Sequence, residues 1–113
     1  MNKKSIIEKT GHFNTLLIES LRDPAQASAY LQVALDEFQE DGDNEAFLMA
    51  LRNITEAKGG VGLLAENTHL NRQSLYTTLS SRGNPRLSTL GSIVKGLGFH
   101  LSISPIESQS VRK

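Results

Sequence analysis

The sequence contains no cysteine and no long apolar run, and both absences exclude whole classes of protein. Without cysteine there is no disulfide framework, no thiolate metal site and no cysteine nucleophile. A membrane-spanning helix needs about 20 mainly apolar residues, and no stretch comes near that length. The N-terminus lacks the apolar core and cleavage site of a secretory signal. We therefore expect a soluble, cytoplasmic protein, and 113 residues fit one domain.

Residues suited to catalysis or to metal binding are also scarce. His12, His69 and His100 are far apart, and no pair has the spacing of metal ligands. No serine lies in the glycine pattern of a nucleophile elbow. The sequence therefore favours a protein without enzymatic activity, and we expect no catalytic residue, metal, cofactor or small-molecule substrate.

The formal net charge is zero, but the charges are unevenly distributed. Residues 1–59 hold six Lys and Arg against ten Asp and Glu, whereas residues 60–100 hold four against Glu66 alone. A basic half beside an acidic half suggests one surface that faces phosphates and a second surface with another role. Charge balancing for solubility would give the same asymmetry, so charge alone does not decide the function.

Helical periodicity extends over most of the chain. Asp23 as a cap, followed by Pro24, predicts a helix that ends near Glu40. Its apolar stripe consists of Ala27, Tyr30, Leu31, Ala34, Leu35 and Phe38. Asp43 is expected to cap the next helix. The residues before position 23 could form a short helix or an extended arm, and the first ten are expected to be disordered.

Residues 61–82 are the stretch around which the other helices are arranged. A short helix from Val61 is followed by a turn at His69 and a second helix that Asn71 can cap. This spacing is typical of a helix-turn-helix, in which the second helix enters the DNA major groove. Glycine and proline in 83–85 end that helix, and a further helix covers 87–97. Its two internal glycines each lower helix propensity by up to about 1 kcal/mol.

Exposed side chains of the second helix have types that suit contacts with DNA. Arg can bind guanine, Gln can bind adenine, and Thr can hydrogen-bond a base or touch a thymine methyl group. The residues that we expect to contact bases are Arg72, Gln73, Thr77 and Thr78. The residues that we expect to contact phosphates, which position a protein without reading sequence, are Asn71, Ser74, Ser81, Arg82, Asn84 and Arg86. For Tyr76 we favour packing against the next helix over stacking on the DNA backbone.

Two other segments lead to more open predictions. A run of carboxylates lies at the first helix–helix corner and is either solvated surface or a docking surface for a basic partner protein. Its members are Asp36, Glu37, Glu40, Asp41, Asp43 and Glu45, of which the first four are the candidate partner surface. Apolar and polar residues alternate over 99–104, which predicts a short β-strand that Pro105 ends. Such a strand must pair with another segment, for example with its copy in a second subunit.

Three stretches together resemble the addiction module antidote proteins, which are HigA-like prophage DNA-binding regulators. They read FLMALRNITEAKG, LLAENTHLNRQSLYTTLS and GNPRLSTLGSIVKGLGFHL, and the resemblance covers roughly residues 21–104. Its most specific elements are Arg72, Leu75 and Tyr76 together with residues 83–85. Two positions depart from the family pattern, because His69 stands where glycine is usual and Gly96 replaces an alanine.

The resemblance implies a lambda-repressor-like all-α domain over 23–104, which we expect to have about five helices and a short C-terminal β-strand. An N-terminal arm would cover 1–22 and a polar tail 105–113. It also implies an antitoxin of a type II toxin–antitoxin module. Such a protein neutralises a RelE/ParE-type toxin and, as a homodimer on double-stranded operator DNA, represses its own operon. The alternatives are a solitary phage-derived repressor and a protein-interaction module that has lost DNA binding.

Overall fold

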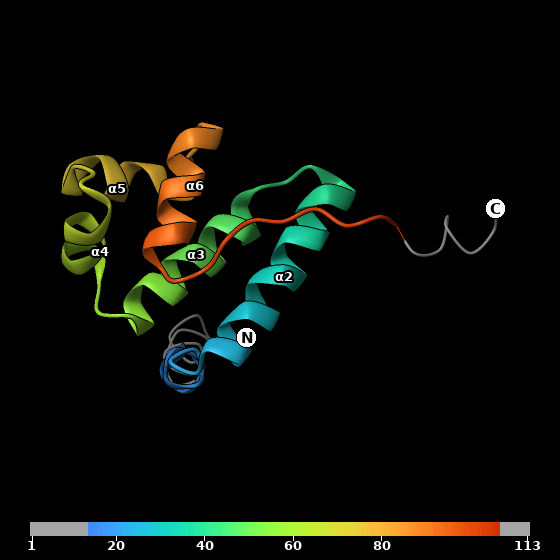
Figure 1. Cartoon of the computed structure of the whole chain (residues 1–113), viewed down its shortest axis with the longest axis horizontal. Helices are drawn as coiled ribbons and strands as arrows, with labels where there is room; N and C mark the ends of the chain where they lie inside the picture. Colours follow the sequence, from blue (N-terminus) through green and yellow to red (C-terminus); the bar gives the residue numbers. More distant parts are fainter. Residues whose placement is uncertain (1–13, 107–113) are drawn as a thin grey trace, which may run out of the picture.

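The computed structural model describes residues 14–106. The described chain is all-α, as expected, but it has six helices rather than about five (Figure 1). The additional helix covers residues 14–20, where the sequence left both a helix and an arm open. The expected disorder of the first ten residues, and the polar tail beyond residue 106, fall outside the described residues.

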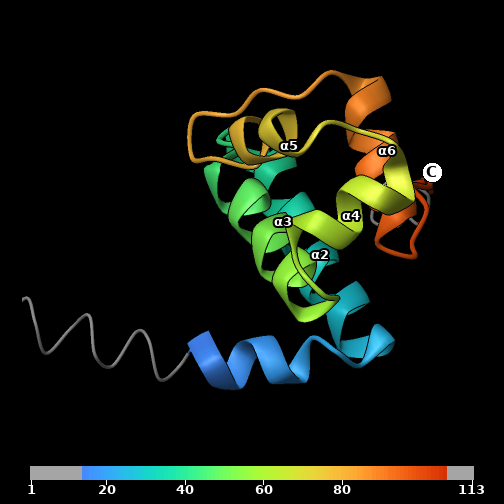
Figure 2. The ribbon, with the colours of Figure 1, turned by 90° about the vertical axis from the view of Figure 1, so that its left-hand side faces the viewer.

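The helix of residues 14–20 lies across the base of the other helices (Figure 2). Leu17 packs against the core, and Leu21, directly after the helix, is only 1% exposed. The Leu21 N–H donates to the Leu17 carbonyl oxygen at 3.0 Å. Apolar contacts therefore attach this segment to the body of the domain.

The helix α2 (Pro24–Asp41) begins as its first residues predict. The Asp23 carboxylate accepts the N–H of Gln26 at 3.1 Å, and proline occupies the first helical position. Gly42, with φ 75°, ends the helix in the left-handed conformation that favours glycine. The buried members of the predicted apolar stripe are Ala27, Leu31 and Ala34.

The next helix starts later than predicted and is capped differently. The N-cap of α3 (Glu45–Ala57) is Asn44 and not Asp43. Asp43 still contributes, because its carboxylate accepts the N–H of Glu45 at 3.1 Å. The Asn44 side chain makes no cap bond, and its amide instead donates to the carbonyl oxygen of Gly83 at 3.3 Å. The corner between α2 and α3 is thereby tied to a loop 39 residues further along the chain.

The core is one cluster of buried side chains to which α2, α3, α4, α5 and α6 all contribute. α2 and α3 run side by side, and α4 (Val61–Thr68), α5 (Arg72–Thr78) and α6 (Leu87–Gly96) pack around the opposite face of α3 (Figures 1 and 2). Burial of one large apolar side chain stabilises the fold by about 1.5–3 kcal/mol. The apolar side chains with the least exposure include Leu48, Leu51, Ile54, Leu75, Ile93 and Val94.

Gly96 allows α6 to approach α4 closely. A Cβ atom at this position would lie 2.5 Å from Thr68 Cγ2 and 3.0 Å from Leu64 Cδ1. Thr68 is held in place, because its hydroxyl donates to the Leu64 carbonyl oxygen at 2.7 Å and accepts the Leu70 N–H at 3.2 Å. The glycine that departs from the family pattern therefore serves helix packing, whereas the sequence suggested only a weakened helix.

Gly96→Ala is expected to destabilise the domain by about 1–2 kcal/mol. Overpacking typically costs about 1–3 kcal/mol, and the gain in helix propensity of up to about 1 kcal/mol offsets only part of it. Gly91→Ala in the same helix is the matched control, since a Cβ atom there meets nothing within 4 Å. It should stabilise by about 0.5–1 kcal/mol. Denaturant unfolding measures both changes, and a stabilised Gly96→Ala variant would contradict the close approach.

The predicted β-strand over 99–104 is not present in the described residues. Phe99 is anchored, because its N–H donates to the Val94 carbonyl oxygen at 3.0 Å and the Lys58 Nζ lies 5.4 Å from its ring centroid. Beyond it the segment crosses α3 and α2 without regular structure (Figure 1). A strand needs a neighbouring strand for its hydrogen bonds, and residues 14–106 offer none.

Candidate nucleic-acid interface

The helices α4 and α5, joined by a tight turn at His69, have the order and spacing that the sequence predicts for a helix-turn-helix. Leu64 of α4 and Leu75 of α5 are 3% and 1% exposed and hold the two helices on the body. Leu70 in the turn packs against the same core. The apolar side of α5 is therefore buried, and its polar side faces outward.

His69 makes the tight turn without glycine. It is the one non-glycine residue with positive φ among those described, at φ 61° and ψ 20°. Its N–H donates to the Ala65 carbonyl oxygen at 2.8 Å, which ends α4 in the usual left-handed manner. Histidine is among the residues that adopt this conformation more readily than most. The departure from the family pattern at this position thus leaves the turn intact.

Asn71 sets the first turn of α5. It has extended backbone angles, and its side-chain oxygen accepts the N–H of Ser74 at 3.1 Å. The side-chain amide nitrogen is not used by any described residue. Asn71 can therefore cap the helix and still donate a hydrogen bond outward, as a phosphate contact would require.

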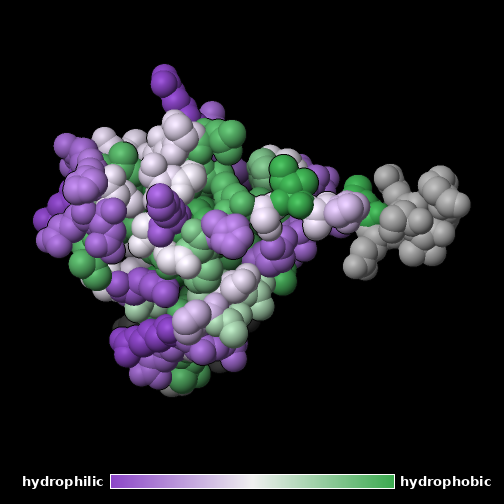
Figure 3. Space-filling view, in the orientation of Figure 1, coloured by the Kyte–Doolittle hydropathy of each residue, from purple (hydrophilic) through white to green (hydrophobic). Residues whose placement is uncertain are grey.

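Most of the side chains predicted to contact bases lie on the open face of α5. Arg72, Gln73 and Thr77 are exposed, and their side chains form no hydrogen bond or ion pair with a described residue, whereas Thr78 is half-buried. The Arg72 guanidinium lies against Gly62, where a Cβ atom would come within 2.8 Å of Nη2. The surface over α4 and α5 is mainly hydrophilic in this view (Figure 3).

Residues predicted to contact phosphates follow α5 in the loop before α6. Ser74 lies on α5 itself and is also exposed. The exposed residues of the loop are Ser81, Arg82, Asn84 and Arg86. Arg82, Asn84 and Arg86 thus bring three side chains of basic or amide character next to α5, an arrangement that would suit phosphate contacts.

Two residues that the sequence did not single out hold this loop. The Arg52 guanidinium of α3 donates to the Leu79 carbonyl oxygen at the C-terminal end of α5, where a cation is favoured. The Asn44 amide holds the Gly83 carbonyl oxygen, as described above. Neither has a local sequence signal, because the partners are 27 and 39 residues apart.

The interpretation of Tyr76 as a packing residue is wrong. Its side chain is 56% exposed and lies at the edge of a hollow of about 370 Å³ between α3, α4 and α5. Arg52, Glu56 and Val61 are among the other residues that line this hollow. Tyr76 therefore belongs to the outer surface of the helix-turn-helix.

The carboxylates of the predicted partner surface lie on the C-terminal half of α2. Asp36, Glu37, Glu40 and Asp41 are all exposed, and none forms an ion pair with a described residue. Two accept hydrogen bonds, Asp36 from the Gln32 amide at 2.9 Å and Asp41 from the Asp43 N–H at 2.9 Å. The negative charge of this surface is thus not neutralised within residues 14–106.

The described part of the chain contains neither a candidate metal site nor a candidate membrane-spanning helix. Residues 14–106 hold no group of three or more His, Asp or Glu side chains that could bind a metal ion. No helix among them combines the length and the apolar character needed to cross a membrane.

Comparison with known proteins gives a match over most of the chain. A family model described as "Probable addiction module antidote protein" matches residues 10–105. A protein of Haemophilus influenzae, described as an uncharacterized protein, is 29% identical over 73 residues, which are 65% of this chain and 74% of that protein. No solved structure matches the chain. The range matched by the family model contains α2 to α6 and therefore all residues of the candidate interface.

Proposed function

Because the chain belongs to the family of probable addiction module antidote proteins, as its motifs indicated, we propose that it is a DNA-binding antitoxin that represses its own operon. An antidote implies a cognate toxin as partner. DNA binding is supported above all by one observation, the open polar face of α5 on a capped helix-turn-helix. In this proposal α5 enters the major groove, and a homodimer occupies two half-sites about one helical turn apart.

The proposal gives each side chain of the interface a role. Arg72, Gln73 and Thr77 read base edges, because they lie exposed and unpaired on the open face of α5. Thr78 is less exposed and would read a base only at the rim of the contact. Asn71, Ser74 and the loop residues contact phosphates and position α5 in the groove.

The toxin would dock on the acidic surface of α2. The family resemblance implies a small basic toxin, and the four carboxylates offer unpaired negative charge. In Figure 1 the helices α2 and α5 lie on different sides of α3, although the corner after Asp41 contacts the loop that follows α5 through Asn44 and Gly83. A toxin of the RelE/ParE type could therefore be held without covering the recognition helix.

DNA binding is tested with the purified chain and the DNA upstream of its own gene. We expect a gel shift and a defined footprint, with affinity at least about a thousandfold above that for random duplex. Equal affinity for both would contradict operator binding and favour a protein-interaction module. Capture of the product of the neighbouring gene distinguishes an antitoxin from a solitary phage-derived repressor.

Neutralising the acidic surface should weaken toxin binding and leave DNA binding unchanged. The test variant carries Asp36→Asn, Glu37→Gln, Glu40→Gln and Asp41→Asn, and all four positions are exposed, so the fold should tolerate it. Loss of complementary charge mainly slows association, and we expect about tenfold weaker capture of the toxin at low salt. Unchanged capture would show that the toxin docks elsewhere.

A further inference from the structure

The segment of residues 99–105 presents an open hydrogen-bonding edge. From His100 to Ile106 no backbone N–H or carbonyl group is hydrogen-bonded to a described residue. Leu101 and Ile103 are 41% and 100% exposed, and residues 98–106 contain no Lys, Arg, Asp or Glu. Proteins commonly protect such edges with charged residues, and an apolar edge without them is suited to pairing with another chain.

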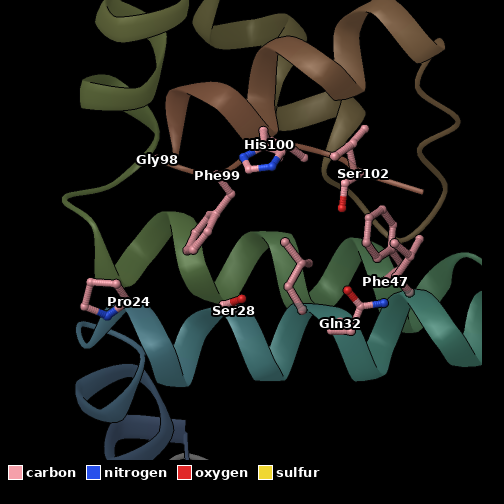
Figure 4. A pocket seen from close by; sticks show the side chains of 12 residues that line it. Pro24, Ser28, Gln32, Phe47, Gly98, Phe99, His100 and Ser102 are labelled. Atoms are coloured by element: carbon pink, nitrogen blue, oxygen red, sulfur yellow. The ribbon is translucent and has the colours of Figure 1, made fainter. Parts of the chain in front are cut away.

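A hollow of about 460 Å³ lies between this segment and α2 (Figure 4). Its apolar lining includes Leu31, Leu35, Phe47 and Val94. Phe99 reaches from the segment toward the helices, while Ser28 and Gln32 of α2 lie opposite (Figure 4). A second strand placed along the segment would cover this apolar lining. An isolated two-stranded ladder is only marginally stable, and packing against helices provides the support that it needs.

We propose that residues 99–105 pair with the same residues of a second copy of this chain, as an antiparallel two-stranded β-ladder over this hollow. A two-fold dimer brings identical surfaces together, so the segment must be complementary to itself. It meets this requirement because no like charges come to lie opposite each other. A partner recognised by charge would find no charged side chain in this segment.

The register of the ladder follows from the two ends of the segment. With Ser102 on the two-fold axis as a hydrogen-bonded pair, His100 and Ser104 form the next hydrogen-bonded pairs. Phe99 then lies opposite Pro105 at a position that exchanges no backbone hydrogen bonds. Neither residue has a backbone N–H available for such a bond, because the Phe99 N–H already donates to the Val94 carbonyl oxygen and proline has no N–H. Leu101 lies opposite Ile103 of the second copy, and both fall on one face.

The biological role of this ladder rests on the proposed function. The ladder would be the contact that joins two helix-turn-helix units for two half-sites. Dimer formation is measured without DNA or toxin, so its failure is distinguishable from failure of operator binding.

Association of the full chain, followed by sedimentation velocity across the micromolar range, tests the interface. We expect a dimer for the natural sequence. Ile103→Lys should raise the dissociation constant at least about a hundredfold, because an apolar side chain is lost from the contact twice in a two-fold dimer. Val33→Lys, on the outer side of α2 and 57% exposed, is the matched control and should dimerise normally. A monomeric natural chain, or an Ile103→Lys variant that dimerises normally, overturns the proposal.

A cysteine scan tests the register, since the chain contains no other cysteine. Paired Cα atoms about 5.5 Å apart suit a disulfide, so Ser102→Cys should form a covalent dimer under mild oxidation. Ser88→Cys, at an exposed position on α6, is the control. Ser102→Cys that crosslinks no faster than Ser88→Cys overturns the proposed register. Thermal unfolding followed by circular dichroism verifies that all four variants are folded.

Discussion

Gly83→Ala is expected to lower the free energy of unfolding by about 3 kcal/mol, at the upper end of typical overpacking costs. A Cβ atom at Gly83 would lie 1.8 Å from the Thr78 carbonyl oxygen and 2.7 Å from the Thr78 carbonyl carbon. Both atoms belong to the backbone of α5, so no side-chain rotation can relieve the contact. The backbone would have to move, although the Gly83 N–H is bonded to Ser80 and its carbonyl oxygen to Asn44.

Denaturant unfolding measures the free energy of unfolding of Gly83→Ala, and Asn84→Ala serves as the control. Asn84 is the exposed neighbour in the same loop, and its substitution should change stability by no more than about 0.5 kcal/mol. If the two variants unfold alike, the loop can relax around a methyl group and the close approach is not required for the fold. In the expected case, operator binding is also weakened, because the loop carries the predicted phosphate contacts.

Arg72→Ala and Gln73→Ala are each expected to weaken specific DNA binding by about 1–3 kcal/mol and to relax the preference at one base pair. Both side chains lie on the open face of α5 and have no partner among the described residues. Neither contributes to the core, so thermal stability should stay near that of the natural sequence. Competition binding with operator variants, substituted at one base pair at a time, measures the effect.

Arg82→Ala is the control for this experiment. Arg82 is exposed in the loop after α5, where we expect it to contact a phosphate. Its loss should weaken binding to specific and to random DNA about equally, and should reduce the slope of log affinity against log salt concentration by about 1. An Arg72→Ala variant that behaves like Arg82→Ala would show that Arg72 binds phosphate and reads no base.

The features predicted correctly depend on residues close together in the sequence. Asp23 with Pro24, and Asn71 with Ser74, cap their helices through groups three or fewer residues apart. The outward face of α5 follows from helical periodicity once Leu75 is assigned to the core. Most of the candidate interface could therefore be predicted without the structure.

The features that were missed depend on contacts between distant segments. The Asn44 amide was not predicted to hold Gly83, because a local pattern favoured Asp43 as the cap. Gly96 reduced the expected helicity of α6, although its role is the approach to α4. The strand over 99–104 was predicted because apolar and polar residues alternate there, but this alternation does not provide the second strand with which it must pair.

The separation of α5 from the acidic surface of α2 has a kinetic consequence for the proposed DNA complex. A molecule with no net charge gains nothing from overall attraction to DNA. The exposed arginines at and after α5 (Arg72, Arg82 and Arg86) and the exposed carboxylates of α2 would nevertheless turn it during approach, so that the arginines lead and the carboxylates point away. Screening at physiological ionic strength acts over about 8 Å. Added salt should therefore slow productive encounters by randomising orientation, even where the final contacts are unchanged.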